Sequence, residues 1–345
     1  MSHRLSVHDR SADLCAGRDS PDIRVRVRSR RTDLQVRGMW VRDVDIPDHR
    51  ASRVRSAECG VPDWAAAFAL LLLACCACGA HHPITVTDGR GKKVSIAHEP
   101  KRIVSLTPNN TEILFALGLG ERVVGVTTMC DYPPAARKKP KVGDYRTSIE
   151  KVVALKPDLV LAHAHLNKQA IPALEKLGQT VIAFDPKTLA DLCRDIRTIG
   201  LANGRRVQAE AISGRIGAAL ADVRKAAAKS RTRPKVMVVI QAQPLWVAGP
   251  RTFVDEMIRA ANARNIARDA KAGFSQFSTE VAVSRDPDVI IVRNGGAKGI
   301  LDSPIWKRTS AVRDGRLHEF DMNLLVRPGP RLAQGIRNLA RALRP

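Results

Sequence analysis

The sequence predicts an α/β protein of two similar α/β lobes joined by a long backbone helix. Short apolar runs alternate with helical segments from residue 84 onward, a pattern typical of parallel sheets covered by helices. One segment occurs twice with the same spacing, and residues 189–230 form a long stretch without an internal proline. A chain of 345 residues is long enough for two such lobes.

The duplicated segment has a serine, a glutamate two positions later, and a Pro-Asp pair before an apolar run. The copies consist of Ser148, Glu150, Pro157 and Asp158 and of Ser278, Glu280, Pro287 and Asp288. Serine is a favoured N-cap, glutamate suits the first helical turn, and proline stops the helix. Each copy therefore predicts a short helix that leads into a buried strand. Glu150 and Glu280 either have this local role or form a pair suited to docking on a two-fold partner.

The first lobe is predicted as an open parallel sheet preceded by a small hairpin. The predicted strands are residues 84–89, 93–96, 103–106, 123–126, 159–161 and 181–184. A helix is expected over residues 113–117, with Asn109 and Glu112 as a capping box and Gly118 at its end.

Residues 189–230 predict a helical connection with a break near Asn203 and Gly204. Residues 205–229 alone would be about 37 Å long as a helix, enough to run from one lobe to the other. The second lobe then begins with a strand at 235–240 and continues as a second α/β set through residues 252–261, the second copy of the duplicated segment and a final helix from Arg331. The predicted boundaries are 84–186 for the first lobe, 187–232 for the connecting helices and 233–345 for the second lobe.

Residues 61–80 are predicted to be a signal peptide. The apolar run at 64–74 is too short to span a membrane and is followed by small residues. Residues 72–75 also have the form of a bacterial lipobox, in which Cys75 becomes lipidated, while residues 78–80 leave ordinary cleavage open. We therefore expect a periplasmic protein, either free or anchored through Cys75.

Residues 1–60 are rich in arginine but contain no lysine, so they are either a start assigned too far upstream or a disordered basic extension. The formal net charge of +23 favours an anionic ligand, a membrane surface or nucleic acid. We expect no nucleic-acid partner, because the sequence has no interleaved basic and aromatic face. Beyond the signal region, Cys130 and Cys193 leave a disulfide open.

No catalytic or cofactor motif is found along the chain. Gly118, Gly120 and Gly125 do not form a dinucleotide cradle, because they fall at a helix end and inside a strand. The sequence also lacks a P-loop, a GxSxG motif and an HExxH motif. His163 and His165 could bind iron or cobalt, but alternate positions of a strand face opposite ways, so at most one would face a cleft. We predict a protein with no enzyme activity, no catalytic residues, no metal site and no cofactor of its own.

Five motifs, in order along the chain, resemble one family. They are Arg102-Ile-Val-Ser-Leu-Thr-Pro108-Asn-Asn-Thr-Glu112, Asp131-Tyr132-Pro133-Pro134, Val142-Gly-Asp-Tyr145, Ala154-Leu-Lys-Pro157-Asp158 and Arg327-Pro-Gly-Pro-Arg331. The chain from about residue 84 resembles the periplasmic cobalamin-binding proteins of ABC importers, whose wider family also covers haem and ferric siderophores. The resemblance implies two α/β lobes with little hinge motion, a ligand cleft between them, and delivery of a corrinoid to a permease dimer in the inner membrane. We expect a monomer.

The resemblance also implies which residues bind. Ligand contacts carried over by motif are Met129, Tyr132, Tyr145, His163, Trp246, Phe274, Asn323 and Arg327. A cobalamin-binding member of the family has aromatic rings where Met129 and His163 stand, tryptophan where Tyr145 and Phe274 stand, and an acid in place of Asn323. Glu150 and Glu280 occupy the positions at which family members dock with arginine-lined pockets of the permease.

Two other functions remain open from the sequence. A haem receptor would use Tyr132, Tyr145 or His163 as an axial ligand. A receptor for an anionic ferric siderophore would be favoured by the basic charge, although the cleft motifs contain no cluster of arginines. A tetrapyrrole chelatase would use His163 and Glu112, although the lipobox and the two glutamates argue against an enzyme.

Overall fold

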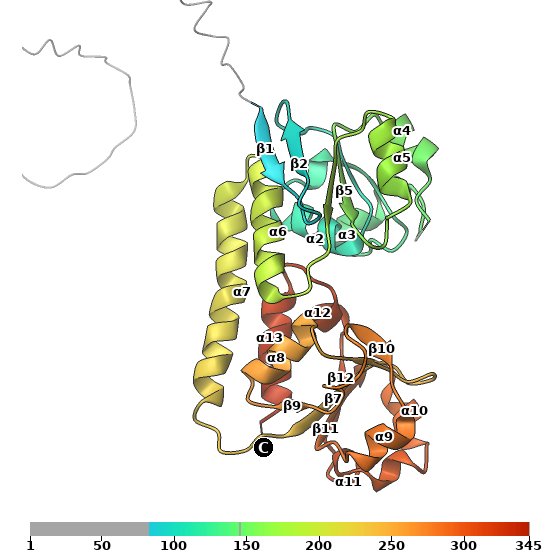
Figure 1. The fold of residues 1–345 in the computed structure, drawn as a ribbon, viewed down its shortest axis with the longest axis vertical. Coiled ribbons are helices and arrows are strands. Elements are labelled where there is room, and N and C mark those ends of the chain that lie inside the picture. Colours follow the sequence, from blue (N-terminus) through green and yellow to red (C-terminus); the bar gives the residue numbers. More distant parts are fainter. Residues whose placement is uncertain (1–82, 145, 345) are drawn as a thin grey trace, which may run out of the picture. The chain divides into compact units, whose positions relative to one another are not determined.

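The computed structural model of the protein describes residues 83–144 and 146–344, which form an α/β structure with two main sheets (Figure 1). The predicted extension at 1–60, the signal peptide at 61–80, Cys75 and Tyr145 lie outside the described residues.

The first lobe is built on a four-stranded parallel sheet in the order β4-β3-β5-β6. Its strands are β3 (Ile103–Ser105), β4 (Val123–Val126), β5 (Leu159–His163) and β6 (Val181–Phe184). The antiparallel pair of β1 (Ile84–Thr87) and β2 (Lys93–Ile96) precedes them. The predicted hairpin and parallel sheet are confirmed. The strands are buried along most of their length, as expected for a parallel sheet covered on both faces.

The helices of the first lobe are α2 (Pro108–Ala116), the 3-10 turn η1 (Gly120–Arg122), α3 (Pro134–Arg137), α4 (Ile149–Ala154) and α5 (Ala170–Lys176). α2 begins earlier than predicted, because Pro108 suits the first helical position and Thr107 precedes it as the N-cap residue. The predicted capping box of Asn109 and Glu112 is therefore wrong, since both residues lie within the helix. Gly118, with a φ of 77°, follows the helix end as predicted.

Two helices, α6 (Leu189–Ala202) and α7 (Arg206–Ala227), connect the lobes. The predicted break is confirmed at Asn203 and at Gly204, which has a φ of 66°. The 22 residues of α7 span about 33 Å. α7 packs against α6 and against α13 (Leu332–Ala342) in the second lobe, and Figure 1 shows it running beside both.

The second lobe repeats the parallel order of the first, as β9-β7-β11-β12. Its strands are β7 (Lys235–Gln241), β8 (Trp246–Ala248), β9 (Arg264–Asn265), β10 (Phe274–Gln276), β11 (Val289–Arg293) and β12 (Leu317–Phe320). β8 and β10 extend the sheet by antiparallel pairing, which the sequence did not predict. Its helices before α13 are α8 (Phe253–Ala260), α9 (Thr279–Ser284), α10 (Ala297–Leu301), η2 (Trp306–Arg308), α11 (Ser310–Arg313) and α12 (Asn323–Val326).

The duplicated segment has the same backbone in both lobes. α4 and α9 each contain six residues, and β5 and β11 each contain five. Between helix and strand, Lys156 and Asp286 both adopt a left-handed φ of 45°. The prediction of two lobes built alike is confirmed at the level of single backbone angles.

The Pro-Asp pair of each copy fixes the beginning of a neighbouring strand. The carboxylate of Asp158 accepts a hydrogen bond of 2.9 Å from the backbone N–H of Arg102, next to β3. The carboxylate of Asp288 accepts one of 2.7 Å from the backbone N–H of Lys235, the first residue of β7. The two aspartates therefore perform the same task at equivalent strand pairs.

Cys130 and Cys193 do not form a disulfide with each other, because both are free thiols. Cys130 is buried and lies 3.2 Å from the hydroxyl of Thr111, whereas Cys193 is half-buried on α6. No helix in the described part of the chain has both the length and the apolar character needed to cross a membrane.

Candidate functional site

A cavity of about 760 Å³ is lined by residues of both lobes. The first lobe contributes residues that follow the carboxyl ends of β3, β4, β5 and β6, and the second lobe contributes residues 251–253, 272–274 and 326–328. Ligand sites of open parallel sheets lie at this end of the strands, where loops with polar side chains converge. The volume is typical of a small-molecule site.

Apolar side chains line the cavity from both sides. Met129 of the first lobe and Phe274 of the second are 39% and 37% exposed, which leaves their surfaces available to a bound molecule. The ring of Phe274 meets the buried ring of Phe253 edge-to-face, with centroids 6.2 Å apart. This contact restricts the exposed ring in the absence of a ligand.

His163 stands at the end of β5 with both ring nitrogens engaged. Its Nδ1 accepts hydrogen bonds from the backbone N–H groups of His165 and Leu166, at 3.2 and 3.3 Å. Nε2 therefore carries the proton and lies 3.5 Å from Oδ1 of Asp185, which also pairs with Lys187 at 2.6 Å. Burial lowers the pKa of His163, outweighing the opposite effect of Asp185.

His165 also lines the cavity, and its side chain is exposed. The prediction that at most one of the two histidines faces a cleft is wrong, because β5 ends at His163 and a turn follows. No cluster of three or more histidine, cysteine or acidic side chains suited to a metal ion occurs among the described residues.

Glu112 joins the two lobes through its buried carboxylate. Its oxygens accept hydrogen bonds from Arg331 at 2.8 and 2.6 Å and from Arg327 at 3.2 Å. Arg327 also donates to Asp131 at 2.6 Å, and this bond lowers the pKa of Asp131 although burial opposes the shift. We call these four residues the interlobe ion network.

Two further residues surround Arg331. Its guanidinium lies 3.9 Å from the ring centroid of Tyr132, in cation–π geometry, and 3.7 Å from Asp321. Tyr132 therefore contacts the interlobe ion network.

The structure brings four of the predicted ligand residues together at the cavity: Met129, His163, Phe274 and Arg327. Three others are not among its lining residues. Tyr132 stacks on Arg331, Trp246 lies in β8, and Asn323 begins α12. Together with Tyr145, their roles stay predictions.

Sequence reasoning missed several polar residues of the cavity. Asp185 and Lys187 follow β6, and Asn167 accepts a hydrogen bond of 2.8 Å from the backbone N–H of His163. Their position in the sequence could have identified them, because polar residues directly after a buried parallel strand lie at the ligand-binding end of the sheet. Arg251 gave no comparable signal.

Glu150 and Glu280 are exposed on α4 and α9. The helix caps come from the serines, since Ser148 accepts from the N–H of Lys151 at 3.3 Å and Ser278 from that of Val281 at 3.2 Å. A hydrogen bond of 2.7 Å from Ser278 also lowers the pKa of Glu280. Both carboxylates are directed to solvent from equivalent helices.

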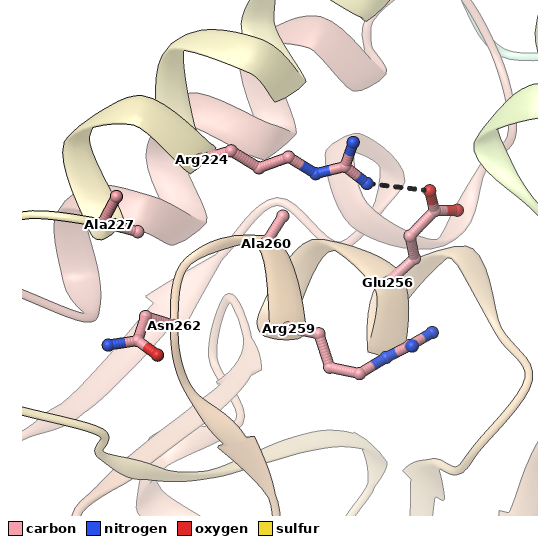
Figure 2. Close-up of a pocket in the computed structure, with 7 residues that line it drawn as sticks. Arg224, Ala227, Glu256, Arg259, Ala260 and Asn262 are labelled. Carbon is pink, nitrogen blue, oxygen red and sulfur yellow. Dashed lines mark ion pairs between the residues drawn. The ribbon is translucent and has the colours of Figure 1, made fainter.

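A smaller cavity of about 420 Å³ lies between α7 and α8 (Figure 2). Figure 2 shows Arg224 of α7 directed toward Glu256 of α8, with 3.7 Å between the charged atoms. Glu256 also accepts a hydrogen bond of 3.0 Å from the backbone N–H of Leu189, at the start of α6. Through these two contacts, Glu256 links both connecting helices to the second lobe at the edge of this cavity.

Two α/β lobes that share a cavity define a ligand-binding protein of the two-lobed class. The periplasmic binding protein family matches residues 103–324, and the chain belongs to this family. The uncharacterized ABC transporter substrate-binding lipoprotein YvrC from Bacillus subtilis (strain 168) is 37% identical over 271 residues, covering 76% of this chain and 86% of that protein. A cobalamin-binding protein from Halobacterium salinarum (strain ATCC 29341 / DSM 671 / R1) is 30% identical over 274 residues, covering 75% of this chain and 74% of that protein.

Solved structures have the same fold. The periplasmic heme-binding protein RhuT from Roseiflexus sp. RS-1 is 33% identical, with a TM-score of 0.63 over 70% of this chain and 97% of that one. The periplasmic vitamin B12 binding protein BtuF of Vibrio cholerae is 26% identical, with a TM-score of 0.64 over 71% of this chain and 96% of that one. The fold predicted from the sequence is confirmed.

Proposed function

We propose that this substrate-binding protein captures cobalamin or a related corrinoid and delivers it to its ABC importer. The cavity of about 760 Å³ between apolar surfaces on two lobes carries this proposal. A flat macrocycle is held well by opposing surfaces of this kind. One buried aromatic ring covers about 150–250 Å², which at about 25 cal/mol per Å² contributes several kcal/mol.

The hydrogen bonding of His163 supports a ligand held by its faces and edges rather than by a metal bond. Its Nδ1 lone pair accepts backbone hydrogen bonds, and its Nε2 faces Asp185. A coordinated cobalt or iron would need one of these nitrogens free. The cobalamin-binding and vitamin B12-binding relatives support the same ligand class.

Haem is the second candidate, and His165 favours it. This imidazole is exposed and lines the cavity, and among the described residues its ring nitrogens have no hydrogen-bond partner. Heme-binding proteins are also among the similar solved structures.

Calorimetric titration of the purified protein with cyanocobalamin, with haem as a parallel ligand, tests the proposal. We expect one-to-one binding of cyanocobalamin. No cobalamin binding together with a Soret shift on adding haem would move the protein to haem transport. If His165→Ala then abolished the shift, this residue would be the axial ligand.

We also propose that Glu150 and Glu280 dock with the permease. Their exposure on equivalent helices supports this role, and charges at the rim of an interface chiefly set orientation and association rate. Glu150→Ala with Glu280→Ala should reduce uptake of labelled cargo while leaving its affinity unchanged. Glu121→Ala, an exposed acid outside the duplicated segment, is the matched control. Equal uptake by the double variant and the control would remove both glutamates from the interface.

We further propose that Cys75 carries a lipid that tethers the mature protein to the membrane, as expected from the lipobox. Metabolic labelling with a fatty acid should mark the protein and not its Cys75→Ser variant. The proposal includes no catalysis. In a chelatase Glu112 would be a catalytic residue, but both oxygens of its carboxylate accept hydrogen bonds from Arg327 and Arg331 and are therefore occupied.

A further inference from the structure

Three long basic side chains line the cavity, and two of them are neutralised. Lys187 pairs with Asp185 at 2.6 Å, and Arg327 pairs with Asp131 at 2.6 Å. Arg251 is exposed and forms no ion pair with any described residue. An anionic group in the cavity would therefore find its available positive partner at Arg251.

Arg251 also lines an adjoining pocket of about 380 Å³, so the two cavities share this residue. We call this second cavity the arginine pocket, after Arg233, Arg251, Arg259, Arg264 and Arg268. Its one acid, Asp255, pairs with Arg259 at 3.0 Å and accepts a hydrogen bond of 3.1 Å from Asn265. The other four arginines have no ion pair within the described parts of the chain. Like charges grouped in this way attract an anion.

The backbone of Arg251 is held in a conformation that residues with a side chain rarely adopt, with a φ of 59°. The surrounding loop enforces it. Gly249 donates to the carbonyl of Gly273 at 2.9 Å, Gly273 donates to that of Pro250 at 3.0 Å, and Thr252 donates to that of Gly249 at 3.0 Å. These bonds keep Arg251 in a conformation that arginine rarely adopts, and so fix the point from which its side chain leaves the loop.

We propose that Arg251, together with the arginine pocket that it also lines, binds an anionic substituent of the cargo. This inference rests on the proposed function and defines its substrate class as a macrocycle that carries a phosphodiester or a carboxylate. A guanidinium binds two oxygens of such a group through parallel hydrogen bonds. Cobalamin offers the phosphodiester of its nucleotide loop, and haem offers its propionates.

The test compares ligands that differ in the anionic group. Cobinamide lacks the nucleotide loop and its phosphodiester, so the full-length protein should bind cobalamin about tenfold more tightly than cobinamide at low salt. Arg251→Gln should lose this preference by weakening cobalamin alone, and Arg251→Lys should restore part of it. Arg215→Gln, an exposed arginine of α7, is the control with the same charge change.

The outcomes separate this inference from the proposed function. Tight cobalamin binding that Arg251→Gln leaves unchanged, or an equal loss for both corrinoids, would overturn the inference and leave the function standing. If haem binds instead of cobalamin, Arg251→Gln should weaken the binding of haem but not that of its dimethyl ester, which lacks the propionate charges. This result would support the inference and contradict the corrinoid function. Binding of neither ligand would overturn both. If thermal unfolding shows Arg251→Gln to be misfolded, Arg264→Gln with Arg268→Gln replaces it under the same criteria.

Discussion

Glu112 is a buried carboxylate whose charge is shared between two arginines of the other lobe. Removing one partner of a buried ion pair leaves an uncompensated charge, which costs about 3–5 kcal/mol. Because Arg327 keeps Asp131 as a partner, we expect Glu112→Ala to lower the free energy of unfolding by about 3 kcal/mol, the lower end of this range, measured by urea denaturation. Asp321→Ala removes a longer and more exposed contact to Arg331 and should cost less than about 1 kcal/mol. Equal losses in the two variants would contradict this account of the network.

Asp195 is a second buried acid, and its Oδ2 has no hydrogen-bond partner among the described residues. Burial, reinforced by neighbouring acids, raises its pKa from 3.8 to about 7. Between these two values the folded protein holds a proton that the unfolded chain has released. The stability contributed by this proton is therefore present at pH 4 and is lost as the pH rises toward 7.

We expect the wild-type protein to lose about 4 kcal/mol of unfolding free energy through Asp195 between pH 4 and pH 8. Asp195→Asn should lack this component, so the difference between the two proteins should change with pH. Asp222→Asn, at an exposed position of α7, should follow the wild-type pH dependence. Urea denaturation at several pH values measures the effect, and parallel curves for wild type and Asp195→Asn would contradict the assigned pKa.

At single positions, the sequence predicted which residues lie at the ligand site better than it predicted which residues contact one another. His163 and Phe274 were expected at the ligand site and do line the cavity. The pairing of Glu112 with Arg327 joins positions separated by 215 residues, and no local pattern encodes such a contact. Arg251 was missed for the same reason, because its importance depends on a cavity formed by the fold.

At the scale of elements, α12 and α13 approach so closely that only glycine fits between them. A Cβ atom on Gly335 of α13 would overlap the backbone carbonyl oxygen of Leu324 in α12. Because backbone cannot move aside cheaply, we expect Gly335→Ala to lower stability by more than about 2 kcal/mol in thermal unfolding. Outside its own helix turn, a Cβ atom on Gly214 of α7 would meet no atom of the described residues within 4 Å, so Gly214→Ala should stabilise by about 0.5–1 kcal/mol. A neutral Gly335→Ala would show that the two helices separate freely.

Elements with strong local signals were predicted well. The duplicated helix and strand, the break at Gly204 and the parallel strands all depend on proline, glycine or continuous apolar runs. β8 and β10 were missed because each has only three residues and begins at an exposed one, whereas the three residues of β3 are all buried within an apolar run. α2 begins before the predicted capping box at Asn109, because proline is favoured in the first turn of a helix and Pro108 occupies that position.

At the scale of the whole binding unit, three separate ties restrain the lobes. α7 packs against α13 of the second lobe. Glu256 of the second lobe contacts both connecting helices. The interlobe ion network joins Glu112 of the first lobe to two arginines of the second. We expect small-angle X-ray scattering to give the same radius of gyration with and without bound cargo. Glu112→Ala combined with Glu256→Ala should introduce a ligand-dependent change. Glu210→Ala, which removes a surface pair between α6 and α7, should not. A compaction of the wild-type protein on binding would contradict rigid lobes.

Arg327 belongs both to the wall of the cavity and to the bond between the lobes. A force that pulls the lobes apart must break its contacts with Glu112 and Asp131, and in doing so it withdraws part of the wall that encloses the cargo. Separation of the lobes and opening of the cavity wall are therefore one event at Arg327. A transporter that grips both lobes could expel the cargo without entering the cavity.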